Sequence, residues 1–122
     1  MKSEPRTILF VEDEPLLGEL MTEALTDKGF AVQAVHDARD ALRYLLSGAE
    51  VDVMFTDIDL GEGMDGAQLA KLARELRPGL PIVYASGRRS VNDIATVPDS
   101  VFLPKPYSLY QVDQTLARIG EK

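Results

Sequence analysis

The strongest constraint on the fold is a regular alternation between short apolar runs and longer segments whose apolar residues recur at helical spacing. The apolar runs have the pattern of buried strands and cover residues 8–11, 30–35, 51–56, 82–85 and 101–103. Strands that are apolar along most of their length are typical of a parallel sheet covered on both faces. The alternation therefore predicts an α/β domain.

Helix signals follow the apolar runs. Pro15 suits the first turn of a helix, and Asp37 and Ser108 suit the N-cap positions of two others. Helices are expected over residues 15–28, 38–46, 67–76 and 109–119, with a short or irregular fourth helix around residues 91–96. Five strand-then-helix units with right-handed crossovers predict a doubly wound, flavodoxin-like fold with strand order 2-1-3-4-5 and about five helices.

Length and composition limit the remaining possibilities. We expect residues 1–122 to form a single domain with no output domain. Without cysteine, and with a single histidine, the chain cannot hold a thiolate or multi-histidine metal site. The net charge of −7 argues against nucleic acid as a partner. No signal peptide or membrane span is recognisable, so no membrane association and a cytoplasmic location are expected.

Charged and polar residues follow four of the predicted strands directly. Glu12 and Asp13 follow the first strand, Asp57 the third, Ser86 the fourth and Lys105 the fifth. The carboxyl ends of parallel strands share one edge of a sheet, so these side chains are expected to converge. Neighbouring carboxylates repel each other unless a cation neutralises them, and Mg²⁺ prefers oxygen ligands. The bland alternative is that the acidic residues after the first strand only favour the dipole of the next helix.

At this point the sequence resembles the receiver domain of bacterial response regulators in two-component signalling. The matching stretches occur in the family's order over nearly the whole chain: ILFVEDE (8–14), FTDIDL (55–60), MDG (64–66), IVYASG (82–87) and FLPKPY (102–107). The resemblance implies that Asp57 accepts a phosphoryl group from a phosphohistidine. It also implies a Mg²⁺ or Mn²⁺ ion bound by Asp13, Asp57 and the backbone carbonyl of Asp59, with Glu12 acting mostly through a metal-bound water.

The same resemblance assigns roles to the later strand ends. Lys105 pairs with Asp57 and then with a phosphate oxygen, and the Lys105–Pro106 peptide bond is expected to be cis. Ser86 donates to another phosphate oxygen and draws its loop inward. Phe102 matches the aromatic position that switches with Ser86, although a strand residue on a covered face is the alternative.

Two positions that flank the phosphate in this family are occupied by Asp59 and Arg88. We hypothesise that they pair across the site entrance and shield the acyl phosphate from water, which sets its lifetime. The alternative is two solvated charges of little energetic consequence. Between Ser86 and Lys105 lie 18 residues, fewer than the family usually has, so its usual dimer cannot be assumed. A monomer or a phosphorylation-dependent dimer is expected.

Other functions remain open at this stage. The Asp57-x-Asp59 pattern resembles that of Mg²⁺-dependent phosphatases with an aspartyl nucleophile, but no later acidic pair follows the fourth strand. A receiver-like interaction module that takes no phosphate is the other alternative. The preferred prediction is a phosphoacceptor that catalyses only its own phosphorylation and dephosphorylation. Its expected partners are a sensor histidine kinase or a histidine phosphotransfer protein, and an unknown downstream protein.

Overall fold

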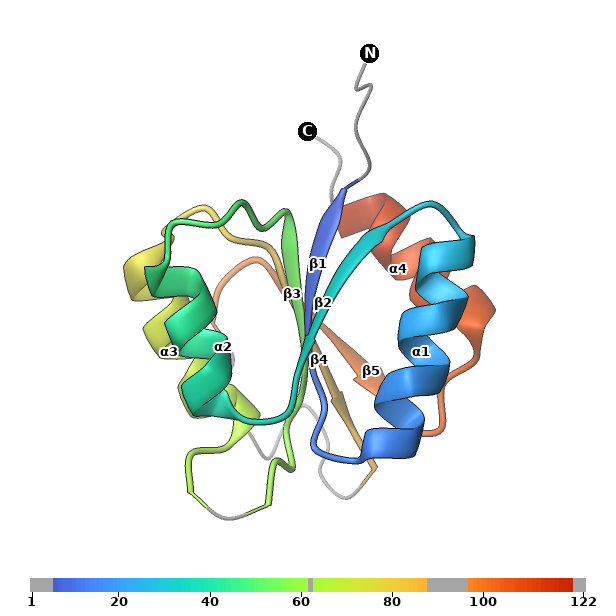
Figure 1. The fold of residues 1–122 in the computed structure, drawn as a ribbon, viewed down its shortest axis with the longest axis horizontal. Coiled ribbons are helices and arrows are strands. Elements are labelled where there is room, and N and C mark those ends of the chain that lie inside the picture. The colour runs from blue at the N-terminus through green and yellow to red at the C-terminus, as the bar shows by residue number, and fades with distance from the viewer. Residues whose placement is uncertain (1–5, 62, 88–96, 120–122) are drawn as a thin grey trace.

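The computed structural model describes residues 6–61, 63–87 and 97–119. In this part of the chain, five parallel strands form one sheet (Figure 1): β1 (Thr7–Val11), β2 (Ala31–Val35), β3 (Val53–Asp57), β4 (Ile82–Ser86) and β5 (Ser100–Pro104). Their order is β2-β1-β3-β4-β5, which confirms the predicted flavodoxin-like sheet.

The helices of the described residues cover both faces of the sheet. They are α1 (Pro15–Asp27), α2 (Ala38–Leu46), α3 (Gly66–Leu76) and α4 (Leu109–Ile119). Figure 1 shows α2 and α3 on one face, and α1 and α4 on the other. The short helix predicted around residues 91–96 lies outside the described residues. No helix in the described ranges is long and apolar enough to cross a membrane.

The apolar core has two parts, one on each face of the sheet. Side chains alternate along β1, so that Ile8 and Phe10 pack under α1 and α4, while Leu9 and Val11 pack under α2 and α3. All four are at most 1% exposed. The fully apolar strand pattern is thus explained by burial on both sides.

The helix starts follow from their capping residues. The Asp37 carboxylate accepts the Asp40 N–H at 2.8 Å, and the Ser108 hydroxyl accepts the Gln111 N–H at 3.1 Å. Both caps confirm the sequence prediction. Pro15 stands at the start of α1, as its fixed φ favours.

The third strand begins two residues later than predicted. Asp52 precedes it, and its carboxylate accepts the Thr7 N–H at 2.6 Å. Regular pairing with β1 starts at Val53, opposite Ile8, and just before it the Asp52 N–H donates to the Thr7 carbonyl at 2.8 Å. The strand then runs on to Asp57, which lies beside Ala85 of β4. The register brings the carboxyl ends of β1, β3 and β4 to one edge.

Candidate functional site

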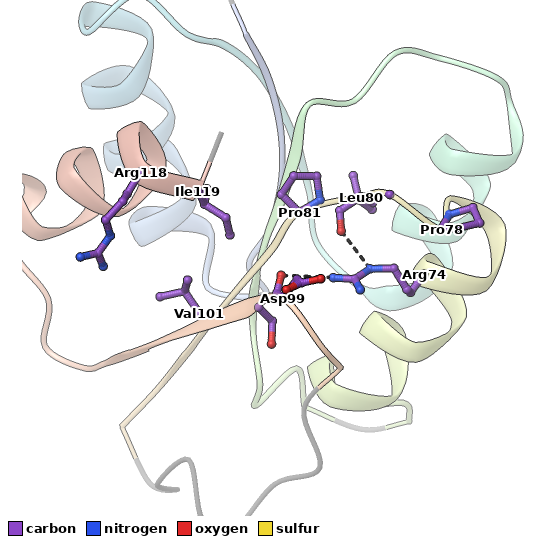
Figure 2. Close-up of a pocket in the computed structure, with 10 residues that line it drawn as sticks. Arg74, Pro78, Leu80, Pro81, Asp99, Val101, Arg118 and Ile119 are labelled. Atoms are coloured by element: carbon purple, nitrogen blue, oxygen red, sulfur yellow. Dashed lines mark hydrogen bonds between the residues drawn. The ribbon is translucent and has the colours of Figure 1, made fainter. Parts of the chain in front are cut away.

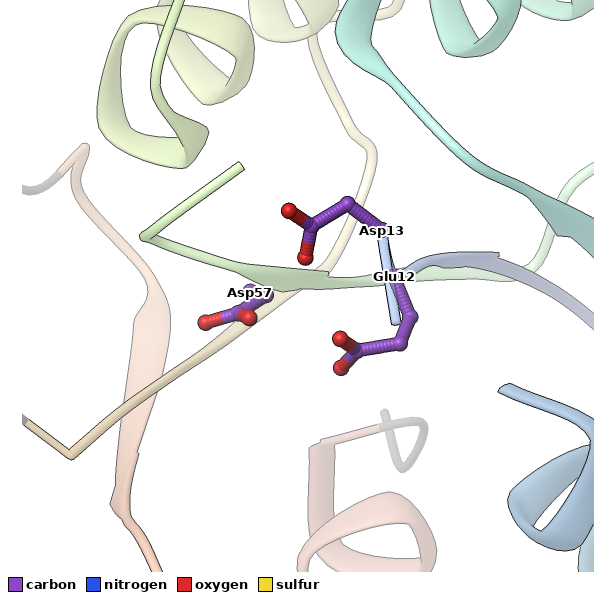
Figure 3. A group of neighbouring side chains, drawn as sticks. All are labelled: Glu12, Asp13 and Asp57. Atoms are coloured by element: carbon purple, nitrogen blue, oxygen red, sulfur yellow. The ribbon is translucent and has the colours of Figure 1, made fainter. Parts of the chain in front are cut away.

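Three carboxylates gather at the carboxyl edge of the sheet. Glu12 and Asp13 follow β1 directly, and Asp57 is the last residue of β3. Figure 3 shows their side chains facing a common space, and one oxygen of each lies within 4.8 Å of the others. The three residues line a hollow of about 540 Å³ together with Asp59 and Lys105. This edge therefore concentrates negative charge in a small volume.

Two of these carboxylates are buried. Glu12 is 3% exposed and Asp57 is 6% exposed, whereas Asp13 is exposed. Burial, reinforced by the neighbouring Asp57, raises the pKa of Glu12 to about 7. The bond from the Glu14 N–H to Glu12 Oε2, at 3.1 Å, offsets only part of that effect.

Lys105 supplies a positive charge to this cluster. Its Nζ donates to Asp57 Oδ2 at 3.1 Å and lies 3.7 Å from Glu12 Oε1. Burial raises the pKa of Asp57, and Lys105 opposes that rise. For Lys105 itself, burial disfavours the charge, but the attraction of Asp57 and Glu12 prevails and raises its pKa. One ammonium thus faces two buried carboxylates and an exposed one.

Backbone contacts hold Lys105 and Ser86 beside each other. The Lys105 N–H donates to the Ser86 carbonyl at 2.9 Å, and the Lys105–Pro106 peptide bond is cis. The Ser86 side chain is 1% exposed, and its hydroxyl donates to Asp59 Oδ2 at 3.2 Å. The structure therefore brings Ser86, Asp59, Asp57 and Lys105 together, as expected from the strand ends.

The loop after β3 is fixed by a close backbone approach. The Gly66 N–H donates to the Ile58 carbonyl at 2.9 Å, and a Cβ on Gly66 would overlap the carbonyl oxygen of Asp57. The Asp59 N–H also donates to Asp57 Oδ1 at 3.3 Å. The sequence analysis placed Gly66 in the MDG stretch (64–66) of the family resemblance and gave it no structural role. The signal that could have found its role is its place next to Asp65, the N-cap of α3.

The predicted switch residue Phe102 lies on β5, beside β4. Phe102 is half-buried, lies beside Tyr84 in the β4–β5 register and packs against the core under α2 and α3. Tyr84 is fully buried, and its hydroxyl accepts the Val97 N–H at 3.0 Å, a bond that the sequence did not reveal. Arg88, the expected partner of Asp59, lies outside the described residues.

Tyr107 is a further neighbour that sequence reasoning left unassigned to the site. Its ring centroid lies 5.7 Å from that of Phe55. Burial, with the nearby charges of Glu12 and Asp57, raises the pKa of its phenol. It therefore stays neutral at physiological pH beside the acidic cluster.

The donor set fits a hard divalent cation. Carboxylate oxygens from Glu12, Asp13 and Asp57 lie close enough to share one ion, and the ammonium of Lys105 leaves much of their charge uncompensated. Burial and the charge of Asp57 keep the pKa of Glu12 raised although Lys105 lies 3.7 Å away. Fold and site together define an α/β domain with a cluster of carboxylates that fits a divalent cation.

Comparison with known sequences identifies the family. The sequence model described as the response regulator receiver domain matches residues 8–117, so the chain belongs to this family. It is 32% identical, over 95% of its length, to the transcriptional regulatory protein GlrR of Escherichia coli (strain K12). It is also 32% identical, again over 95% of its length, to the sensor kinase CckA of Brucella abortus (strain 2308). The chain spans 27% of the first protein and 13% of the second.

Solved structures agree with this assignment. A response regulator receiver protein from Sinorhizobium medicae WSM419 has a TM-score of 0.88 and 38% identity, covering 97% of this chain and 96% of that one. The response regulator TrrA of Thermotoga maritima, solved in complex with Mg²⁺-BeF, shares the fold with a TM-score of 0.79 and 21% identity, covering 93% of this chain and 98% of that one. The chain is thus a receiver domain, the phosphoacceptor module of two-component systems.

Proposed function

We propose that Asp57 is the residue that accepts the phosphoryl group. The observation that supports this assignment is the placement of its buried carboxylate next to both the Lys105 ammonium and the acidic pair of Glu12 and Asp13. An oxygen of Asp57 attacks the phosphorus of a phosphohistidine, a P–O bond forms, and the P–N bond breaks. The electron pair of that bond returns to the imidazole nitrogen, and an acyl phosphate remains on Asp57.

The acidic cluster would hold Mg²⁺ or Mn²⁺ through Asp13, Asp57 and the backbone carbonyl of Asp59, with Glu12 acting mostly through a water. When bound, the ion supplies positive charge that stabilises the negatively charged phosphoryl group in transfer. Asp13 is exposed and can meet an incoming ion, whereas Glu12 is buried behind it.

Lys105 and Ser86 position the phosphoryl group. Lys105 already donates to Asp57. Its ammonium is therefore close enough to bond to a phosphate oxygen once Asp57 carries the phosphoryl group. Ser86 donates its hydroxyl to another phosphate oxygen, and Phe102 responds to the resulting shift of its loop. Asp59, with Arg88, influences how long the acyl phosphate survives.

The partner that delivers phosphate is a sensor histidine kinase or a histidine phosphotransfer protein. Two features beside the site support a protein donor. Leu16 and Leu20 lie one turn apart on α1 and are 67% and 56% exposed. Next to Lys105, an apolar hollow is lined by Leu17, Pro106 and Tyr107. An unknown downstream protein reads the result, and we expect the domain to act in the cytoplasm as a monomer or a phosphorylation-dependent dimer.

Incubation with acetyl phosphate and Mg²⁺, followed by intact-protein mass spectrometry, tests the proposal. The unchanged protein should gain one phosphoryl mass, and Asp57→Asn should gain none. Asp113→Asn, a partly exposed position on α4, is the matched control and should behave as the unchanged protein. A phosphoryl gain that persists in Asp57→Asn, or no gain in any protein, would refute Asp57 as the acceptor. Chelation of the metal with EDTA should suppress the gain.

A further inference from the structure

The Ser86 hydroxyl is committed to a partner in this structure. It donates to Asp59 Oδ2 at 3.2 Å, within a side chain that is 1% exposed. A serine hydroxyl carries one proton and can donate one strong hydrogen bond at a time. The proposed function requires the same proton at the phosphate. Asp59 and the phosphoryl group therefore compete for one donor.

Hydrogen bonds hold the backbones of both Asp59 and Ser86 beside the acceptor site. The Asp59 N–H donates to Asp57 Oδ1, which fixes the Asp59 backbone beside the acceptor carboxylate. The Ser86 carbonyl accepts the Lys105 N–H, so the backbone of Ser86 is anchored next to the site. Because both residues are bonded at the site, the Ser86 hydroxyl can exchange its acceptor without a change in the pairing of β3 with β4.

We propose that Asp59 is a positioning residue that holds the Ser86 hydroxyl away from the acceptor site until a phosphoryl group displaces it. This inference rests on the proposed role of Asp57. It differs from a shield formed by Asp59 and Arg88, because here Asp59 acts through Ser86. The hydrogen bond from Ser86 to the Asp59 carboxylate must break before Ser86 can donate to a phosphoryl group. The cost of breaking that bond lowers the affinity of the site for the phosphoryl group.

Removing Asp59 has two consequences that must be separated. Asp59→Ala releases the Ser86 proton, and it also removes a negative charge near an anionic ligand. The charge effect remains when Ser86 is replaced by alanine, whereas the effect through the hydroxyl disappears. A double-mutant cycle over Asp59→Ala and Ser86→Ala isolates the second effect. Asp59→Asn is the matched variant, because it removes the charge and keeps an acceptor oxygen for Ser86.

The experiment measures beryllofluoride binding at saturating Mg²⁺ by ¹⁹F NMR, which distinguishes bound from free fluoride. We expect Asp59→Ala to increase the affinity for beryllofluoride both with Ser86 and in the Ser86→Ala background. The increase should be roughly threefold to tenfold larger with Ser86, which is the contribution of one net hydrogen bond. Asp59→Asn should show only the tightening seen without Ser86. Equal tightening in both backgrounds would overturn the inference and leave the proposed function intact.

Measurements on the unchanged protein and on Asp57→Asn distinguish failure of the acceptor assignment from failure of the inference about Asp59. If beryllofluoride binds the unchanged protein and not Asp57→Asn, the proposed acceptor stands and the cycle decides on Asp59. If beryllofluoride does not bind, or binds Asp57→Asn equally well, the acceptor assignment and the inference that rests on it are both refuted.

Discussion

The two edges of the sheet treat charge in opposite ways. At the carboxyl edge, Glu12, Asp13 and Asp57 crowd around one ammonium. At the amino edge, a hollow of about 540 Å³ is lined by arginines, among them Arg74 (Figure 2). Arg74 donates from Nε to the Leu80 carbonyl at 3.0 Å. Its guanidinium therefore donates to backbone carbonyls, whereas Glu12 and Asp57 across the sheet share a single ammonium.

Other arginines of the amino edge bind helix ends. Arg77 Nη2 donates to the Leu45 and Ala49 carbonyls at 2.8 and 2.7 Å, at and just beyond the end of α2. Arg6 Nη1 donates to the Leu116 carbonyl at 2.7 Å, in the last turn of α4. The ends of helices carry partial negative charge and unpaired carbonyls, which guanidinium groups compensate. Charge at this edge binds helix ends, whereas we expect charge at the carboxyl edge to lower stability and to serve binding.

The largest expected effect is a loss of stability as pH rises, which should occur only if the charges of the carboxyl edge destabilise the folded protein. The pKa of Glu12 rises from 4.5 in the unfolded chain to about 7 in the folded one, so the folded state binds the extra proton between these values. Without metal, stability should therefore fall as pH rises from 4.5 to 7, by about 3 kcal/mol. Urea unfolding in EDTA across this range measures the loss.

Glu12→Gln is the control for this pH dependence. The amide cannot ionise, so the fall in stability between pH 4.5 and 7 should become much smaller. Added Mg²⁺ should reverse the loss in the unchanged protein at pH 8, because a cation binds the ionised carboxylates of the native state. A slope that is the same in both proteins would show that Glu12 is not responsible.

The second prediction tests how tightly the carboxyl edge is built. Gly66→Ala places a methyl group against the Asp57 carbonyl, so the backbone must shift where the Gly66 N–H bonds to the Ile58 carbonyl. We expect a loss of about 2 kcal/mol in stability and slower phosphorylation of Asp57. Gly79→Ala, at the amino edge, has no atom within 4 Å of the new Cβ and should be nearly neutral. Thermal unfolding and mass spectrometry measure the two effects.

The sequence could predict the sheet and the convergence of the acidic residues, because both follow from pattern. Apolar runs of strand length and the parallel topology together place Glu12 and Asp57 at one edge. The pattern could not predict which acceptor the Ser86 hydroxyl takes, since Asp59 lies 27 positions away and side-chain rotamers decide the bond. Nor could it predict that the Thr7 N–H of β1 donates to the Asp52 carboxylate just before β3 begins at Val53, since that bond also depends on a side-chain rotamer.

The third prediction concerns the guanidinium of Arg77 at the amino edge. Arg77→Ala leaves the Leu45 and Ala49 carbonyls without their guanidinium donor, so stability should fall by about 1.5 kcal/mol. Phosphorylation of Asp57 should proceed at its normal rate in the folded protein. Arg39→Ala, an exposed arginine on α2, is the matched control and should change stability little. A phosphorylation defect in Arg77→Ala would mean that the two edges are coupled.

The smallest effect is expected for an ion pair that belongs to neither edge. Lys28 Nζ lies 4.0 Å from Asp113 Oδ2, and the two side chains are 46% and 41% exposed. Solvent screens such a pair, and ordering two exposed side chains costs entropy, so Lys28→Ala should lower stability by about 0.3 kcal/mol or less. Urea unfolding at low and high salt checks this value. A loss comparable to that of Arg77→Ala would show that an exposed ion pair outside both edges matters as much for stability as a guanidinium that binds helix carbonyls. The difference between the two edges would then follow from the number of their charges and not from their burial.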